Sequence, residues 1–327
     1  MKKNDNIQIA IEKRIQEEVD FLNNMSPNGL YAPIAYALSN GGKRFRPRLL
    51  LMAMEMFSEV TNIGLDAAMA VEVFHNFTLL HDDIMDGADL RRGKETVHRK
   101  YDANTAILSG DAMMIYAYKK LEGLDAVLQA KVQQVFTQTA LEVCEGQQYD
   151  IEFETRDFVA IEEYLEMIKL KTAVLLAASL KIGAIIAGAN NEDADLIYQF
   201  GLKVGISFQI QDDILDVYGD AETFGKQIGG DIVSNKKTIL MLLAQKSASK
   251  VDGKLLEHWL SKEIFNKEEK ISSVTSIYNS VGVREQAETL QQEYFDEALE
   301  SLDAISVSVA RKQPLRTVAI SLFKRNV

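Results

Sequence analysis

The chain contains one cysteine and four prolines among its 327 residues, and each scarcity excludes a class of protein. Because Cys144 stands alone, no disulfide forms within the chain, and a secreted domain held together by disulfides is excluded. No pair of histidines has the spacing of zinc ligands, so a zinc site is not expected. The prolines leave residues 48–313 free of this helix-breaking residue, which permits a succession of long helices.

Hairpin turns and long uncharged apolar runs are also lacking. Asn-Gly or Asp-Gly turns between alternating strands are not evident, so a sheet-rich fold is not expected. The most apolar stretch, Ala173–Ala189, contains Lys181 and Gly183 and falls short of a membrane span. We therefore predict an all-α protein that forms one domain over residues 1–327. Apolar residues recur at helical spacing in its long segments Val127–Val143, Leu165–Ala187 and Arg284–Leu302.

The net charge bears on which partners the protein binds, and the N-terminus bears on its cellular location. A net charge of −12 argues against a nucleic-acid-binding surface. Met1–Asn6 lacks the apolar core of a signal peptide, and cysteine is scarce, so we expect a cytoplasmic protein without a membrane span. An acidic protein that binds a polyphosphate would need metal ions and locally concentrated Lys and Arg.

Two nearly identical acidic pentads are the most informative feature of the sequence. Residues 82–86 are DDIMD and residues 212–216 are DDILD, and each pentad follows an apolar run compatible with a helix. The first and last aspartates of a pentad are four residues apart, so both project from one face of a helix. Like charges at this spacing repel each other, and a multivalent cation would relieve the repulsion.

Mg²⁺ fits this pair of pentads best. Proteins hold Mg²⁺ with one or two carboxylates, while substrate phosphates and water complete its octahedron. Two clusters therefore suggest two walls that grip one polyphosphate substrate. A calcium site of the EF-hand type is not expected, because neither pentad continues into a glycine-centred loop of twelve residues. The plain alternative of solvated acidic helix ends explains one pentad better than it explains two.

Basic residues gather where such a substrate would bind. Residues 41–48 are GGKRFRPR, which places four cations at a glycine-to-proline junction that should open a helix. Helix N-termini attract anions, and Lys and Arg side chains add charge-assisted hydrogen bonds. His75 lies seven residues before Asp82 and so shares its helix face, which favours a diphosphate-binding role over core packing. Other basic residues follow a pentad or lie between the two: Arg91, Arg92, Lys171, Lys226, Lys236 and Lys237.

Together these residues resemble the trans-isoprenyl diphosphate synthases, the polyprenyl synthetase family, in the order in which that family carries its motifs. The resemblance covers almost the whole chain. It implies a bundle of ten or more helices around a deep central cavity, and a homodimer. The matching segments are Gly41–Pro47, His75, Asp82–Asp86, Arg91–Gly93, Gly146-Gln147, Lys171-Thr172, Gln209, Asp212–Asp216, Gly225–Gly229 and Lys236.

The resemblance also implies substrates and residue roles. The substrates would be isopentenyl diphosphate and an allylic diphosphate. Three Mg²⁺ ions would bind with the substrate at Asp82, Asp86 and Asp212, supported by Asp83, Asp213 and Asp216. The allylic diphosphate would be held by Arg91, Lys171, Lys226 and Lys236. Isopentenyl diphosphate would bind without metal at Lys43, Arg46, His75 and Arg92. The catalytic residues would be Lys171, Thr172, Gln209 and Lys226, with Thr172 and Gln209 over the reacting carbons.

Product length is expected to depend on the residue five positions before Asp82. The growing chain would extend toward the start of that helix, where Phe77 lies roughly 7.5 Å deeper and forms a floor beside the smaller Thr78. Avian-like farnesyl-type members carry aromatics at both positions, and bacterial ones insert two residues into the first pentad. The pattern is most similar to geranylgeranyl-type enzymes and favours a C20 product, with C15 as the alternative. Residues of the following helix, such as Met113, Met114 and Tyr116, could move the floor.

Two interpretations of another kind stay open. A non-catalytic regulatory subunit of a prenyltransferase complex would have lost aspartates, whereas this chain keeps every aspartate and lysine of the pattern. A class I terpene cyclase also uses an aspartate-rich metal motif, but cyclases usually replace the second cluster and lack the Gly-Gly-Lys-Arg pocket. The sequence therefore favours an Mg²⁺-dependent prenyltransferase that makes a short all-trans prenyl diphosphate.

Overall fold

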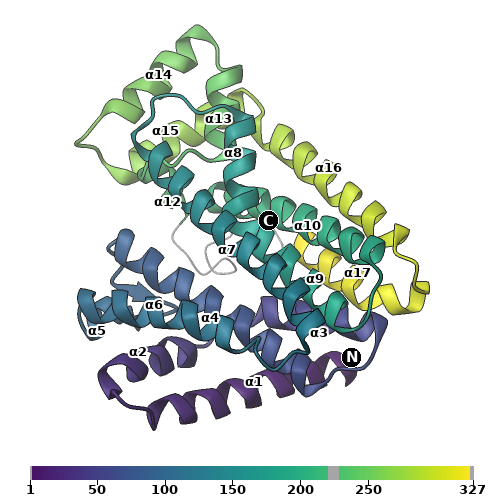
Figure 1. The fold of residues 1–327 in the computed structure, drawn as a ribbon. Coiled ribbons are helices and arrows are strands. Elements are labelled where there is room, and N and C mark those ends of the chain that lie inside the picture. The colour runs from purple at the N-terminus through teal and green to yellow at the C-terminus, as the bar shows by residue number, and fades with distance from the viewer. Residues whose placement is uncertain (1, 220–227, 325–327) are drawn as a thin grey trace. The chain divides into compact units, whose positions relative to one another are not determined.

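The computed structural model describes residues 2–219 and 228–324, and almost all of its regular structure is helical (Figure 1). The all-α prediction is confirmed. The helices in chain order are α1 (Lys2–Asn23), α2 (Asn28–Ser39), α3 (Phe45–Phe57), α4 (Asn62–Met85), α5 (Val97–Lys100), α6 (Ala103–Lys119), α7 (Ala126–Thr155), α8 (Ile161–Ile168), the π-helical turn η1 (Lys169–Ala173), α9 (Val174–Ile186), α10 (Asn191–Tyr218), α12 (Gly230–Val233), α13 (Ile239–Ser247), α14 (Lys250–Ser261), α15 (Lys267–Ser280), α16 (Val283–Ala304) and α17 (Val309–Phe323).

Polar caps and glycines set the helix ends that matter for the site. The Thr61 side chain accepts a hydrogen bond from Gly64 N at the start of α4. At the other end of α4, Asp86 is the C-cap residue, and Gly87 adopts the left-handed conformation with φ +62°. The first pentad therefore occupies the last turn of α4. Pro47 lies in the first turn of α3, as the glycine-to-proline junction predicts.

A short hairpin after α4 was not expected from the sequence. Strands β1 (Leu90–Arg91) and β2 (Lys94–Glu95) pair antiparallel around Arg92 and Gly93. Both turn residues have positive φ, +54° and +74°. A two-residue turn of type I′ needs this backbone, and because Asn-Gly is its usual sequence signal, the Arg-Gly turn was not recognised.

The chain divides into two compact units, and α7, α9, α10 and α17 contribute residues to both. The first unit comprises Met1–Gln138, Ala178–Ile197 and Ser306–Arg311. The second comprises Thr139–Ala177, Tyr198–Ile305 and Lys312–Val327. The organisation as one domain stays a prediction.

Each unit has its own packing. In the first, α4 packs against α3 and α6, around buried residues such as Leu50, Phe74 and Met113. In the second, α13 packs against α8, α14, α15 and α16, and Ile214 and Tyr278 belong to the shared core. Among the described residues, α4 alone is long and apolar enough to cross a membrane, but 67% of its most apolar window is buried inside the protein.

Two glycines in the second unit make room for the turn η1. A Cβ on Gly146 of α7 would overlap the backbone of Lys171, and a Cβ on Gly205 of α10 would lie 2.7 Å from Ala173 Cα. Any larger residue would push its helix away from η1. Because π-helical turns concentrate at functional sites, this close packing marks Lys171 and Thr172 as residues with a defined position.

Candidate active site

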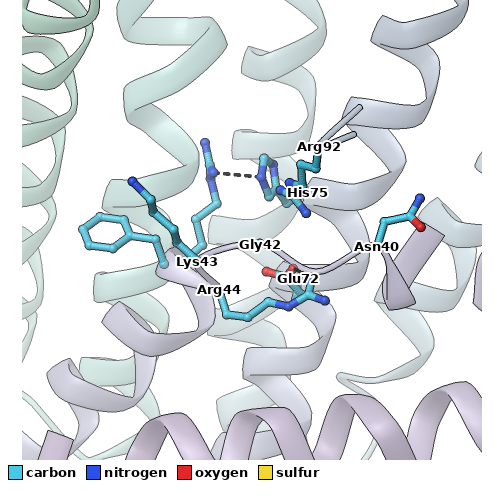
Figure 2. A pocket seen from close by; sticks show the side chains of 9 residues that line it. Asn40, Gly42, Lys43, Arg44, Glu72, His75 and Arg92 are labelled. Atoms are coloured by element: carbon cyan, nitrogen blue, oxygen red, sulfur yellow. Dashed lines mark hydrogen bonds and ion pairs between the residues drawn. The ribbon is translucent and has the colours of Figure 1, made fainter. Parts of the chain in front are cut away.

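A cationic pocket of about 500 Å³ lies in the first unit (Figure 2). It is built by the segment that leads into α3, by α4 and by the hairpin turn. All four residues predicted to bind isopentenyl diphosphate line it, so the structure brings them together. The lining residues are Asn40, Gly42, Lys43, Arg44, Phe45, Arg46, Glu72, His75 and Arg92.

Arg46 and His75 form a hydrogen-bonded pair inside this pocket. Arg46 Nη1 lies 3.0 Å from His75 Nε2. Because a guanidinium only donates, Nε2 of His75 is the acceptor, which requires the neutral ring. Burial lowers the pKa of His75 well below its usual value, and the positive charges of Arg46 and Arg92 lower it further. Burial also lowers the pKa of Arg46 to about 10, so the guanidinium stays charged at neutral pH.

The lowered pKa of His75 predicts a pH-dependent stability. As the pH falls through about 6.5, His75 is protonated in the unfolded chain while the buried ring stays neutral, so the free energy of unfolding decreases. The variant His75→Gln keeps a polar side chain and removes the titrating group. We expect it to lose less stability than the wild type between pH 7.5 and 5.5 in urea unfolding. Identical pH dependence of the two proteins would contradict the lowered pKa.

A buried ion pair lies beside the pocket. Arg44 Nη1 is 2.7 Å from Glu72 Oε1, and each side chain is only 2% exposed. Arg44 also donates to Leu38 O at 2.6 Å, and Asn76 donates to Glu72 Oε1 at 2.9 Å. In Figure 2, Glu72 and Arg44 lie on one side of the Gly42 loop, and His75 and Arg92 lie on the other. This pair was missed by the sequence analysis, although Glu72 stands three residues before His75 on α4.

The ion pair stabilises an unusual backbone at the pocket. Arg44 adopts the left-handed conformation with φ +47°, which is strained for a residue with a long side chain. Its side chain contacts both the end of α2 and α4, so the loop of residues 40–44 between α2 and α3 is held in position. Gly42 has φ +126°, which side chains rarely tolerate, and a Cβ there would displace the Arg92 guanidinium, which donates to Gly41 O. The pocket is thus shaped by the protein before any ligand binds.

The first aspartate cluster projects from the end of α4. Asp83 is buried and forms an ion pair with Arg91. Its Oδ1 lies 2.8 Å from Nε and 2.7 Å from Nη2 of Arg91. Burial raises the pKa of Asp83, and the charge of Arg91 opposes this shift. Arg91, which was predicted to hold the allylic diphosphate, is therefore ion-paired with Asp83. Asp82 and Asp86 share the other face of the turn, where Asp86 is exposed.

The second aspartate cluster lies in α10, just before its end at Tyr218. Asp213 is buried and accepts hydrogen bonds from the Tyr164 hydroxyl, from Ile239 N at 3.1 Å and from Gln209 Nε2 at 3.3 Å. Burial raises the pKa of Asp213 to about 7, with a further contribution from Asp231. The Asp216 carboxylate accepts a hydrogen bond from Asp231 N at 3.0 Å.

Lys171 and Thr172 are positioned by the same unit. Lys171 Nζ forms an ion pair with Asp150 at 2.5 Å, and Thr172 Oγ1 donates to Gln209 Oε1 at 3.3 Å. Gln209 therefore connects the η1 turn to Asp213 through two hydrogen bonds. Asp150 and Tyr164 were missed, because neither stands at a recognisable spacing from a pentad. Lys226 lies outside the described residues, and Lys236 is exposed beyond α12.

The carboxylates suit Mg²⁺ rather than a metal that needs a complete protein cage. In the described part of the chain, no three acidic or histidine side chains form a ready-made metal site. Each pentad still presents two carboxylates four residues apart on one helix face. Mg²⁺ needs only one or two carboxylates when substrate phosphates supply further oxygens. The donor set therefore fits magnesium bound together with a diphosphate.

Comparison with known proteins gives one family throughout. The family model described as polyprenyl synthetase matches residues 27–279. A geranylgeranyl diphosphate synthase of Methanosarcina mazei is 38% identical, over 90% of this chain and 88% of the relative. A geranylfarnesyl diphosphate synthase of Natronomonas pharaonis is 40% identical, over 76% of this chain and 80% of the relative. A crystal structure of a geranylgeranyl pyrophosphate synthase superposes with a TM-score of 0.93 at 43% identity, over 99% of each chain. The chain therefore belongs to the polyprenyl synthetase family and is a trans-prenyltransferase.

Proposed function

We propose that this enzyme condenses isopentenyl diphosphate with an allylic diphosphate and releases an all-trans C20 prenyl diphosphate. The observation that carries the proposal is the cationic pocket, in which Lys43, Arg46 and Arg92 surround a neutral His75. A diphosphate fits such a pocket without metal, because guanidinium and ammonium groups supply the neutralising charge. The C20 product is supported by Phe77 and by the names of the Methanosarcina relative and the 43% identical structure.

We further propose that Asp82, Asp86 and Asp212 hold Mg²⁺ ions together with the allylic diphosphate, with Asp83, Asp213 and Asp216 in support. Bound Mg²⁺ would neutralise charge on the departing diphosphate. Neighbouring protein groups donate hydrogen bonds to Asp83, Asp213 and Asp216. These hydrogen bonds would hold each cluster in position.

The chain's own cations would bind the allylic substrate and favour its ionisation. Arg91, Lys171, Lys226 and Lys236 would contact the diphosphate, and their charges would favour breaking of the allylic C–O bond. The electron pair leaves with the diphosphate, and the double bond of isopentenyl diphosphate then forms the new C–C bond. The carbocation that results loses a proton to the released diphosphate, which forms the double bond of the product. Thr172 and Gln209 would orient the reacting carbons.

Product analysis tests this proposal directly. The purified protein would be incubated with Mg²⁺, isopentenyl diphosphate and a C5, C10 or C15 allylic diphosphate, and product length would be measured by chromatography. A C20 product is expected, and a C15 product would support the farnesyl alternative. A product one C5 unit longer is the second candidate, because the 40% identical Natronomonas relative is a geranylfarnesyl diphosphate synthase. No turnover with any starter would favour a regulatory subunit.

The two diphosphate sites should respond to different substitutions. Arg46→Ala is expected to weaken isopentenyl diphosphate binding by about 10- to 100-fold, since a charge-assisted hydrogen bond contributes about 1.5–3 kcal/mol. The apparent KM of the allylic substrate should change little. Arg48→Ala is a matched control, because Arg48 lies on the same helix but is not among the residues that line the pocket. Equal effects of Arg46→Ala on both KM values would contradict the partition.

The floor of the product cavity is expected at Phe77. Phe77 is buried on α4, 5.4 Å from the Phe74 ring and 4.8 Å from the His81 ring, measured between centroids. Phe77→Ala should lengthen the product by at least one C5 unit, because each buried CH₂ contributes about 0.8 kcal/mol. Thr78→Phe should shift the product toward C15. If Phe77 only packs the core, Phe77→Ala would cost about 3–5 kcal/mol of stability without lengthening the product.

Two further proposals concern assembly and location. We propose that the enzyme acts as a homodimer in the cytoplasm, in line with the family resemblance and the scarcity of cysteine. Sedimentation of the purified protein at micromolar concentration would test the dimer. A monomer with full activity would contradict it.

A further inference from the structure

Lys270 is a buried cation to which none of the roles above is assigned. Its side chain on α15 is fully buried. The ammonium Nζ donates to Asn235 Oδ1 at 2.6 Å and to Val233 O at 3.3 Å, and it lies 4.2 Å from the centroid of the Phe265 ring. These three partners carry no formal charge. Burying a charge against neutral groups is unfavourable, so this lysine stays in place only because its partners are well arranged around it.

The segment that Lys270 holds is irregular and needs support. It runs from Gly229 through α12 to the start of α13. Asn235 adopts the left-handed conformation with φ +56°, and its Nδ2 donates to Leu260 O at 3.0 Å. Lys270 therefore holds Oδ1 of the Asn235 side chain, while Leu260 O of α14 holds its Nδ2. It also satisfies Val233 O at the end of the short helix α12, where a positive charge is favourable.

Both ends of this segment are hydrogen-bonded to the second aspartate cluster. Gly229 N donates to Asp216 O at 2.6 Å, and Asp231 N donates to the Asp216 carboxylate at 3.0 Å. At the far end, Ile239 N donates to the Asp213 carboxylate at 3.1 Å. The segment thus spans from one aspartate of the pentad to another, and Lys270 holds its middle.

Lys236 follows Asn235 directly, so the hydrogen bonds that hold Asn235 also determine the position of Lys236. The backbone of Lys236 is itself fixed, because its N–H donates to Asp231 O at 2.9 Å. We propose that Lys270 is a positioning residue for the allylic-substrate site: through Asn235 it orients Lys236 and keeps the Asp213 and Asp216 carboxylates in place. This inference rests on the proposed function, in which Lys236 binds the allylic diphosphate.

Steady-state kinetics of Lys270→Met test the inference. Methionine keeps much of the apolar volume and removes the ammonium. We expect the KM of the allylic diphosphate to rise about fivefold to tenfold and the KM of isopentenyl diphosphate to stay unchanged. The matched control is Lys267→Met, the same replacement at an exposed position on α15, which should leave both KM values unchanged. Equal changes in both KM values for Lys270→Met would overturn the inference.

A double-mutant cycle separates positioning from general loss of structure. If Lys270 acts through Lys236, adding Lys270→Met to Lys236→Met should raise the allylic KM less than it does in the wild type. Fully additive effects would overturn the inference while leaving the proposed function intact. If Lys236→Met alone leaves the allylic KM unchanged, the role of Lys236 in the proposed function is wrong, and the inference fails with it.

A second variant covers the case in which Lys270→Met does not fold. Asn235→Gly removes the other partner of the contact and tolerates the left-handed backbone at φ +56°. It should reproduce the selective rise in the allylic KM, with thermal unfolding confirming a folded protein at the assay temperature. An unchanged allylic KM in folded Asn235→Gly would overturn the inference.

Discussion

Replacing Asp82 with alanine is expected to lower turnover by at least about 10²- to 10³-fold, the loss typical when a group that neutralises transition-state charge is removed. Asp82 begins the first pentad in the last turn of α4, so its carboxylate shares a helix face with Asp86. Without it, Mg²⁺ would lose one of the few protein oxygens that hold it beside the diphosphate. The fold should survive, because Asp82 is only half-buried and alanine favours the helix.

A matched control for this variant is available in the same region. Asp89→Ala removes an exposed carboxylate of the following loop, where Asp89 pairs with Arg99 at the surface. We expect near wild-type kinetics for Asp89→Ala and the same circular dichroism spectrum for both variants. Full activity of Asp82→Ala, or full activity of the wild type in EDTA, would contradict the metal-assisted mechanism.

Replacing Glu72 with alanine is expected to lower the free energy of unfolding by about 3–5 kcal/mol, because breaking a buried ion pair leaves the other charge uncompensated. The charge left behind is Arg44, which is as deeply buried as Glu72 and already carries a left-handed backbone. Asn76 would lose an acceptor as well. Since Arg44 holds the loop of the cationic pocket, the KM of isopentenyl diphosphate should rise in any variant that still folds.

The comparison for Glu72 is an exposed pair of the same chemistry. Asp195→Ala breaks the ion pair with Lys181, in which the Asp195 side chain is 67% exposed. Surface pairs contribute only about 0–1 kcal/mol, so the urea-unfolding curve should hardly move. A comparably small loss for Glu72→Ala would show that the Arg44–Glu72 pair does not stabilise the pocket loop.

The local sequence determined the helices, because helix formation depends on short-range physics, whereas the family was indicated by the resemblance of motifs in their order along the chain. A proline-free interior and apolar residues at helical spacing are sufficient to predict helices, and the two pentads identify their own helix faces. The cluster of Lys43, Arg46, His75 and Arg92 could be predicted because the residues of a family's motifs keep their order along the chain. Lys43, Arg46, His75 and Arg92 line one pocket, and the binding role expected of them stays a prediction.

Only the tertiary structure decided which groups brace the site, since those contacts join residues far apart in the chain. Glu72 meets Arg44 across 28 positions, Tyr164 meets Asp213 across 49, and Lys270 meets Asn235 across 35. No periodicity or spacing rule relates such pairs, because their partners are set by how helices pack rather than by the order of residues within one helix. The Arg92-Gly93 turn was also decided by the tertiary structure. Arg92 has a left-handed backbone, and its guanidinium donates to Gly41 O, which is 51 positions away in the chain. The residues expected to carry the chemistry can therefore be predicted from the sequence, whereas the contacts that hold them in position can be seen only in the folded structure.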